Sequence, residues 1–192
     1  NALSQSGVVR QDLRTSFNGM TPVADGVQVD LVLTLVNVAS ACAPMAGHAV
    51  YLWHCDAEGQ YSKYDTTDSN YCRGVGITDA AGQVKFTTVF PGCYAGRWPH
   101  MHFEVFADVA SASTGENSLL ISQFALPGDV AQAVYAAMPI YAASIANLGG
   151  VALASDMVFS DNTAEQVAAQ TMVLTGDVAA GFAATGVIGI SV

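Results

Sequence analysis

Short runs of alternating hydrophobic and polar residues recur along this chain and limit the folds open to it. In the longest, VQVDLVLTLVNV at 27–38, every second side chain from Val27 to Leu35 is apolar. Successive side chains on a strand point to opposite faces, so this alternation predicts a strand that covers a core with one face. Further predicted strands are 49–55, 74–78, 83–89, 100–107, 119–125, 171–174 and 181–192. Repeated short strands predict a mainly β fold, a β-sandwich of mixed antiparallel sheets with long loops.

Two local signals add detail to the predicted sandwich. The segment from Asp79 to Gly82 has the composition of a four-residue turn, so strands 74–78 and 83–89 are expected to form a hairpin. Asp129 can cap a short helix that Pro139 ends. One or two short helices of this kind are expected beside the sheets.

Length and composition indicate a single folded domain. The chain has 192 residues, of which 52% are hydrophobic and only 11% charged, which suits one sizeable core and excludes a disordered chain. Residues 1–26 lack the alternation and carry the turn signals Asn18-Gly19 and Asp25-Gly26. They are predicted to form an irregular N-terminal arm, and residues 27–192 the β-sandwich domain.

Charge excludes some partners. A net charge of −10 with six Lys and Arg residues leaves no basic patch for nucleic acid. Residues 130–155 are uncharged over a length that can span a bilayer, but they are mostly alanine and interrupted by polar residues, Pro and Gly. We therefore expect no membrane span. The first 20 residues show no charged start followed by an apolar run, as in a mature exported chain whose signal peptide has been removed.

The cysteines stand at 42, 55, 72 and 93. None forms a C-x-x-C pair, so a structural zinc site has little support. An even number in a compact, lysine-poor, β-rich chain favours two disulfides and an exported protein over four buried free thiols. The spacing leaves all three possible pairings open.

Two histidines two residues apart are the first candidate for chemistry. On a strand, His100 and His102 point to the same face and can reach one metal ion, while Met101 and Phe103 point into the core. Polar residues at this spacing are equally typical of a solvent-facing strand. The pair alone therefore does not establish a site.

Two tyrosines strengthen the case for a metal. Tyr94 lies six residues before His100 across a glycine-containing bend, and Tyr61 follows a glycine turn after the strand at 49–55. A phenolate is a hard anionic donor, and two phenolates with two imidazoles favour Fe(III) over softer or divalent ions. A single loop tyrosine is more often a packed rim residue than a ligand.

Longer stretches of sequence carry a family resemblance. They are VYLWHC at 50–55, DAEGQYS at 56–62, CRG at 72–74, TD at 78–79, GQVKF at 82–86, TTVFPG at 87–92, Tyr94, GR at 96–97, HMH at 100–102, SQF at 122–124 and SDMVF at 155–159. In these the chain resembles the intradiol ring-cleavage dioxygenases, non-haem Fe(III) enzymes that open catechols between the two hydroxyls. The resemblance covers most of the chain from about Val9 to Val192 and is nearest to the exported single-domain branch.

The resemblance implies a site and a reaction. It implies one Fe(III) ion per chain with the ligands Tyr61, Tyr94, His100 and His102. Arg97 would stabilise negative charge on the activated substrate, Gln123 would lie beside it, and Tyr94 would leave the metal and accept a substrate proton. The implied reaction cleaves catechol or substituted catechols with O2 to cis,cis-muconic acids, in a monomer or homodimer. A carboxylated catechol would want a cationic partner, for which Arg73 is one of few candidates.

The cysteines depart from the family pattern. The relatives usually carry an apolar residue at the position of Cys72 and Trp or Pro at that of Cys93. Two unusual cysteines near the same hairpin suggest a Cys72–Cys93 disulfide, which leaves Cys42–Cys55 as the second pair. The alternative is a free Cys93 thiol beside Tyr94.

Two other functions compete with the dioxygenase. The first is a catalytically inactive β-sandwich that binds a ligand or metal on the same fold, and the second is a metal-bound hydrolase. The complete set of four donors with Arg97 speaks against the first. The absence of a candidate Glu or Asp base near His100 in the sequence speaks against the second.

Overall fold

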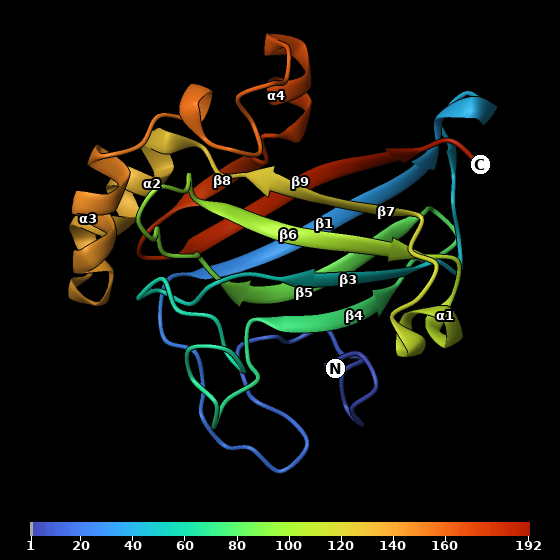
Figure 1. The fold of residues 1–192 in the computed structure, drawn as a ribbon, viewed down its shortest axis with the longest axis horizontal. Coiled ribbons are helices and arrows are strands. Elements are labelled where there is room, and N and C mark those ends of the chain that lie inside the picture. Colours follow the sequence, from blue (N-terminus) through green and yellow to red (C-terminus); the bar gives the residue numbers. More distant parts are fainter. Residues whose placement is uncertain (1) are drawn as a thin grey trace.

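The computed structural model describes residues 2–192 and shows two β-sheets packed face to face (Figure 1). Sheet A is antiparallel, with the strand order β4 (Arg73–Ile77), β3 (Ala49–Trp53), β6 (His100–Phe106), β7 (Leu120–Ala125). In sheet B, β1 (Gln28–Asn37) pairs on one side with β2 (Ala43–Pro44) and β5 (Gln83–Val89). On its other side lie β9 (Gly181–Ile190), parallel to β1, and then β8 (Val173–Asp177). The predicted β-sandwich is confirmed.

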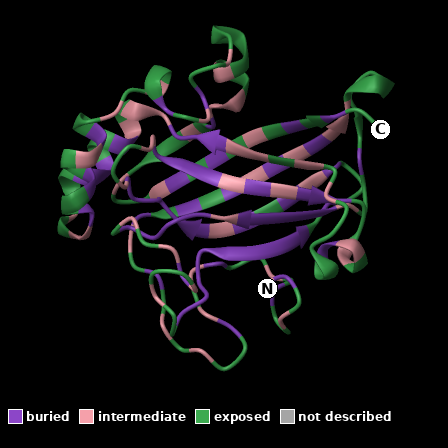
Figure 2. Cartoon of the chain, viewed as in Figure 1, coloured by how far each residue is buried: buried purple, intermediate pink, exposed green. Residues whose placement is uncertain are grey.

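The core fills the space between the sheets, as the alternation requires. Leu31, Leu33 and Leu35 of β1 are at most 1% exposed, and Met101 and Phe103 of β6 face them within the same cluster of buried residues. Figure 2 shows this alternation as buried and partly exposed bands along the strands. Each fully buried leucine or phenylalanine contributes about 1.5–3 kcal/mol of transfer free energy. The sheets are therefore a rigid support for side chains on their outer faces.

The predicted hairpin between strands 74–78 and 83–89 is wrong. The turn forms, with the Gly82 N–H donating to the Asp79 carbonyl at 2.9 Å, but the chain passes there from one sheet to the other. Strand β5 packs across the face of β4 rather than along its edge. A Cβ atom at Gly76 would lie 2.9 Å from Phe86 Cζ, so the missing side chain makes room for this crossing.

Four short α-helices accompany the sheets, more than the one or two predicted. They are α1 (Val109–Thr114), α2 (Gly128–Ala137), α3 (Ala142–Gly149) and α4 (Ala164–Gln170), with 3-10 turns η1 (Val38–Ser40), η2 (Pro139–Tyr141) and η3 (Leu153–Ser155). The predicted helix corresponds to α2, although Asp129 lies in its first turn rather than at its cap. Helices α2 and α3 lie at one end of the sandwich, α4 stands above the sheets at the top of the view, and α1 lies near the opposite end (Figure 1).

The arm at 2–26 has no helix or extended strand; it runs beside β4 of sheet A and β5 of sheet B and covers part of the outer face of sheet A. Its backbone forms isolated bridges from Val9 to Val75 and from Asp12 to Thr87. Leu3, Val8 and Phe17 join a buried cluster with residues of β3, β4 and α1. Among residues 2–192, every helix is too short or too polar to cross a bilayer.

The two predicted disulfides are not formed, and all four cysteines, within the described residues, are free thiols. Cys42 is exposed in the segment between η1 and β2, whereas Cys55 is buried two residues after the end of β3. The Cys93 thiol donates instead to the Arg97 carbonyl at 3.2 Å. Burial raises the pKa of Cys55 and Cys72, and that of Cys93 to about 11, so these thiols are packed as small, unreactive apolar groups.

Candidate metal centre

Four donor atoms from three parts of the chain converge at one end of sheet A. Tyr61 Oη lies 2.9 Å from His102 Nε2, 3.2 Å from His100 Nε2 and 3.4 Å from Tyr94 Oη. The two Nε2 atoms are 3.1 Å apart, and Tyr94 Oη lies 3.3 Å from His100 Nε2. The structure thus brings together all four residues that the sequence pointed to.

These separations suit a single ion. Donors bound about 2.0–2.1 Å from a common metal lie roughly 2.9–3.4 Å apart at bond angles between the right and the tetrahedral angle. Two phenols and two imidazoles are the donor set of a hard, oxidised transition metal. Across residues 2–192, no three His, Cys, Asp or Glu side chains gather closely enough to hold a metal, so any centre here depends on the phenols.

Strand β6 and its partners place the histidines. Met101 is buried in the core, and the imidazoles at 100 and 102 emerge on the opposite face of the strand. The His100 Nδ1–H donates to the Trp98 carbonyl at 2.5 Å, which turns the Nε2 lone pair toward the other donors. The His102 ring stacks on the Trp53 ring at 4.7 Å with an interplanar angle of 9°. Neighbouring groups therefore fix the orientation of both imidazole rings.

Asp56 organises the loop that carries Tyr61. Its carboxylate accepts from the backbone N–H groups of Glu58 and Gln60 at 3.0 and 2.9 Å and from the Tyr71 hydroxyl at 2.9 Å. The Tyr61 N–H in turn donates to Asp65 at 2.7 Å. Sequence reasoning did not single out Asp56, because an Asp before Gly59 looks like an ordinary turn residue.

Helices α2 and α3 anchor the segment that carries Tyr94. Tyr135 and Tyr141 stack at 5.4 Å and donate to the carbonyls of Pro91 and Phe90. The Cys93 N–H donates to Ser144 Oγ, and the Asn147 side-chain amide donates to the Cys93 carbonyl, each at 2.8 Å. The helical end of the sandwich therefore fixes Cys93, the residue directly before Tyr94.

Burial prepares the imidazoles for a metal. Desolvation lowers the pKa of His100 to about 4 and that of His102 to about 3, with the positive charge of Arg97 contributing to both shifts. Both rings are neutral at pH 7 and present lone pairs. Burial also raises the pKa of Tyr61, so this phenol keeps its proton unless a strong Lewis acid displaces it.

Arg97 lies at the edge of the four donors and is held from two sides. Its Nη2 donates to Gln123 Oε1 at 2.6 Å, its Nε donates to Asp156 at 2.9 Å, and its Nη1 lies 3.5 Å from Tyr94 Oη. The pairing of Arg97 and Gln123 inferred from the resemblance is thus present in the geometry.

Asp156, the carboxylate partner of Arg97, is a residue to which sequence reasoning assigned no role. It is fully buried and also accepts from the backbone N–H groups of Trp98 and Val158. Burial alone would raise its pKa, but the Arg97 side chain and these N–H donors outweigh it and lower the pKa. The segment SDMVF at 155–159 was the only signal, and nothing local in it points to an arginine 59 residues away.

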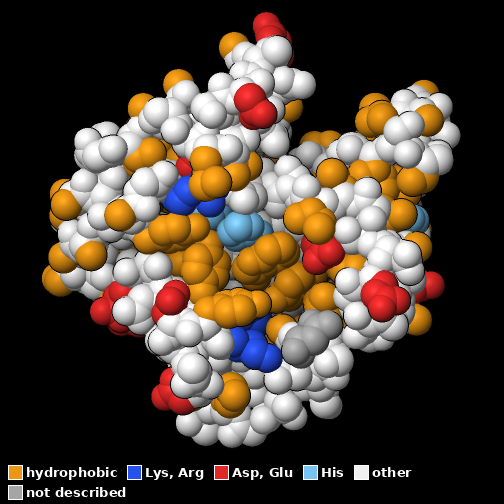
Figure 3. Space-filling model, viewed as in Figure 1, with side chains coloured by type: hydrophobic (Ala, Val, Ile, Leu, Met, Phe, Trp, Pro, Cys, Tyr) orange, Lys and Arg blue, Asp and Glu red, His pale blue; other side chains and the backbone are white. Residues whose placement is uncertain are grey.

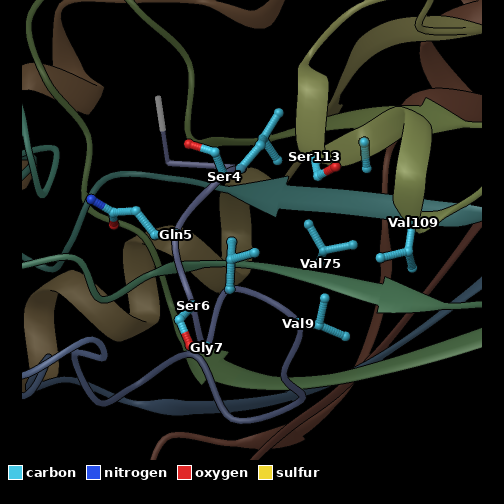
Figure 4. A pocket seen from close by; sticks show the side chains of 11 residues that line it. Ser4, Gln5, Ser6, Gly7, Val9, Val75, Val109 and Ser113 are labelled. Carbon is cyan, nitrogen blue, oxygen red and sulfur yellow. The ribbon is translucent and has the colours of Figure 1, made fainter.

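The donors lie beside an open space. A cavity of about 480 Å³ is lined by Gly59, Gln60, Tyr61, Asp65 and Tyr94. In Figure 3, the same face of the molecule shows a histidine among hydrophobic side chains. A separate cavity of about 370 Å³ lies between the arm and α1 (Figure 4), and no acidic, basic, cysteine or tyrosine side chain lines it. Of these two cavities, only the first is lined by tyrosine side chains.

His54, a buried neighbour of the centre, gives a first prediction. Its Nδ1–H donates to the Cys55 carbonyl and its Nε2 accepts from Thr88, and burial lowers its pKa to about 4. The unfolded chain binds this proton near pH 6.5 and the fold does not, so stability should fall as the pH drops from about 6.5 to 4, by about 3 kcal/mol for this residue. The free energy of unfolding of iron-free His54→Gln, measured in urea between pH 6.5 and 4, should fall by about 3 kcal/mol less than that of the wild type. If the free energy of unfolding of His54→Gln falls with pH as steeply as that of the wild type, or if His48→Gln also flattens this dependence, the prediction is wrong.

Comparison with known proteins identifies the family. The protein-family model Dioxygenase_C, described as "Dioxygenase", matches residues 3–176. The chain is 34% identical over 100 residues to the protocatechuate 3,4-dioxygenase beta chain of Burkholderia cepacia and 31% identical over 107 residues to catechol 1,2-dioxygenase 1 of Acinetobacter lwoffii. Each alignment covers 45% of this chain, and they span only 40% and 32% of the two relatives.

Solved structures share the fold. An intradiol ring-cleavage dioxygenase from Tetranychus urticae superposes with a TM-score of 0.76 at 20% identity, over 97% of this chain and 88% of that one. The dioxygenase domain of a carbohydrate-binding fusion protein from Streptomyces sp. SirexAA-E gives 0.59 at 21% identity, over 98% and 96%. The match of the family model over most of the chain, together with this fold, places the protein in the intradiol ring-cleavage dioxygenase family.

Proposed function

We propose that this protein is a non-haem Fe(III) intradiol dioxygenase that converts catechol or a substituted catechol and O2 into a cis,cis-muconic acid. Both oxygen atoms enter the product, so ring and O2 account for all of its atoms. The observation that carries the proposal is the convergence of Tyr61, Tyr94, His100 and His102 within 2.9–3.4 Å, with a guanidinium beside them. Family membership supports it, since intradiol dioxygenases generally depend on non-haem iron.

A ferric ion held by these four side chains would supply Lewis acidity, which lowers the pKa of catechol hydroxyls. The side chains have different roles beside such an ion. His100 and His102 are neutral donors, and Tyr61 is fixed by the loop around Asp56. Tyr94 lines the cavity, and as a phenolate it would be placed to accept a proton from an entering substrate hydroxyl and become a neutral phenol.

Arg97 is suited to stabilise negative charge that develops on the substrate. Its guanidinium already points at Tyr94 Oη, held by Asp156 and Gln123, so little reorganisation is needed during reaction. Preoriented donors of this kind act most strongly where water is excluded. The side chain of Arg97 is only 11% exposed.

A steady-state panel of catechol, substituted catechols, hydroxyquinol and protocatechuate tests the proposal directly. We expect oxygen consumption in a one-to-one ratio with a product that absorbs as a muconic acid. Iron-loaded protein that consumes no oxygen with any of these substrates would favour the inactive binding module.

The cavity supports a preference for uncharged catechols. None of its five lining residues is Lys or Arg, the charge of nearby Arg97 is already paired with Asp156, and Asp65 adds a carboxylate that accepts from the Tyr61 N–H. Arg73, the sequence candidate for a carboxylate partner, is buried and bonded elsewhere. Catechol should therefore have a higher kcat/KM than protocatechuate, and Asp65→Asn should improve protocatechuate relative to catechol by about fivefold, the value of roughly 1 kcal/mol of charge repulsion. An unchanged ratio in Asp65→Asn would remove this residue from selectivity.

Export from the cytoplasm and a monomeric or homodimeric state stay predictions of the sequence. Secretion of the natural precursor and light scattering of the purified chain test them.

A further inference from the structure

Arg73 on β4 is the largest side chain that the fold buries completely, with 1% of the residue exposed. Its guanidinium has no carboxylate partner: within residues 2–192 the ion pairs are Arg14–Asp12 and Arg97–Asp156. Burying a cation without a counter-ion is unfavourable unless its N–H groups are all well used. The hydrogen bonds of this guanidinium therefore have to offset the cost of burying its charge.

One side of the guanidinium holds the chain next to Tyr61. Arg73 Nε donates to Ser62 Oγ at 3.0 Å and Nη2 donates to the Ser62 carbonyl at 2.5 Å. Ser62 is itself fully buried, and its hydroxyl donates to the Tyr71 carbonyl at 2.6 Å. Two bonds from a planar fork fix both the side chain and the peptide of the residue that follows the ligand.

The other side reaches His102 through a stack of rings. Arg73 Nη1 donates to Tyr51 Oη at 2.8 Å. The Tyr51 ring stacks on Trp53 at 4.8 Å and 18°, and Trp53 stacks on His102 at 4.7 Å and 9°. The backbone register agrees, because Trp53 is paired with Arg73 on one neighbouring strand and with His102 on the other.

We propose that Arg73 is a positioning residue that holds two metal ligands, Tyr61 and His102, in one fixed arrangement. Tyr61 comes from a loop and His102 from a strand, and the guanidinium joins their supports in the interior of the protein. The exposed Tyr64 ring, 5.4 Å from the guanidinium carbon, covers the remaining side. This inference rests on the proposed function, since it assigns a role toward the metal.

The test is iron binding and visible absorption of Arg73→Met and Arg73→Lys, beside the wild type and Arg14→Met as a matched surface control. Loss of a group that orients ligands costs about 10–100-fold in metal affinity, so Arg73→Met should bind iron at least tenfold more weakly and show a shifted tyrosinate-to-iron absorption band. Lysine keeps the charge but cannot reach Ser62 and Tyr51 together, and is expected to show the same shift. Arg14→Met should match the wild type.

Two outcomes overturn the proposal. One is a folded Arg73→Met with wild-type iron affinity and spectrum, and the other is full rescue by Arg73→Lys, which would show that charge rather than geometry matters. If Arg73→Met does not fold, Tyr51→Phe decides: it removes one hydrogen bond and should weaken iron binding by about fivefold, and unchanged binding counts against the proposal. A wild type that binds no iron would instead defeat the proposed function.

Discussion

Replacing His102 with alanine is expected to lower iron affinity by more than about 100-fold and to abolish the colour of the protein. The reason is that His102 Nε2 is 2.9 Å from Tyr61 Oη and 3.1 Å from His100 Nε2, so its loss leaves three donors and an opening for water. Substitutions of residues that only orient a ligand already cost 10–100-fold, so loss of a ligand should cost more. Tyr61→Phe should have the same effect. Iron content after dialysis against a chelator is the measurement.

His48→Ala is the matched control for these variants. His48 is a half-buried histidine whose ring bonds the Ala46 carbonyl, away from the four donors. It should keep iron and turnover at the wild-type level. Full iron retention with normal turnover in Tyr61→Phe or His102→Ala would show that the ligand assignment is wrong.

Replacing Arg97 with methionine is expected to reduce turnover by about 10²–10³-fold, the usual effect of removing one preoriented donor to developing negative charge. Iron content and colour should stay, because Arg97 is not a metal ligand. The variant also leaves the Asp156 carboxylate buried without its partner. That should cost about 3–5 kcal/mol of stability, so activity must be measured well below the melting temperature.

A double variant separates stability from chemistry. Arg97→Met with Asp156→Asn removes the unpaired buried charge and should recover much of the lost stability, while turnover stays low. Recovery of turnover together with stability would show that Arg97 acts only as a structural partner. An unchanged rate in Arg97→Met would remove it from the mechanism altogether.

The strands of this fold could be predicted because they depend on one local property, the alternation of apolar and polar side chains along the sequence. Strand β1 was expected at 27–38 and lies at Gln28–Asn37, and β6 was expected at 100–107 and lies at His100–Phe106. The partner of each strand is not a local property. The turn at Asp79–Gly82 was predicted correctly as a turn, but its sequence cannot tell a hairpin from a crossing between sheets.

The four candidate ligands could be proposed because their residue types are uncommon together and match a family pattern. The residues that hold these side chains in place could not be predicted in this way. Asp156 and Arg73 contact residues 59 and 11–22 positions away, and these contacts depend on the finished fold. The disulfide prediction rested on the even number of cysteines, and that number does not report where the thiols lie in the fold. In the structure, Cys55, Cys72 and Cys93 are packed as small apolar residues in the interior.

The most direct test of the central claim is the visible absorption spectrum of the purified protein, recorded with its iron content. If Tyr61 and Tyr94 bind Fe(III), phenolate-to-metal charge transfer should make the protein reddish with about one iron per chain, and an added catechol should change the spectrum before oxygen is admitted. A colourless protein with a full complement of iron would contradict the assignment of the two tyrosines, and with it the proposed dioxygenase.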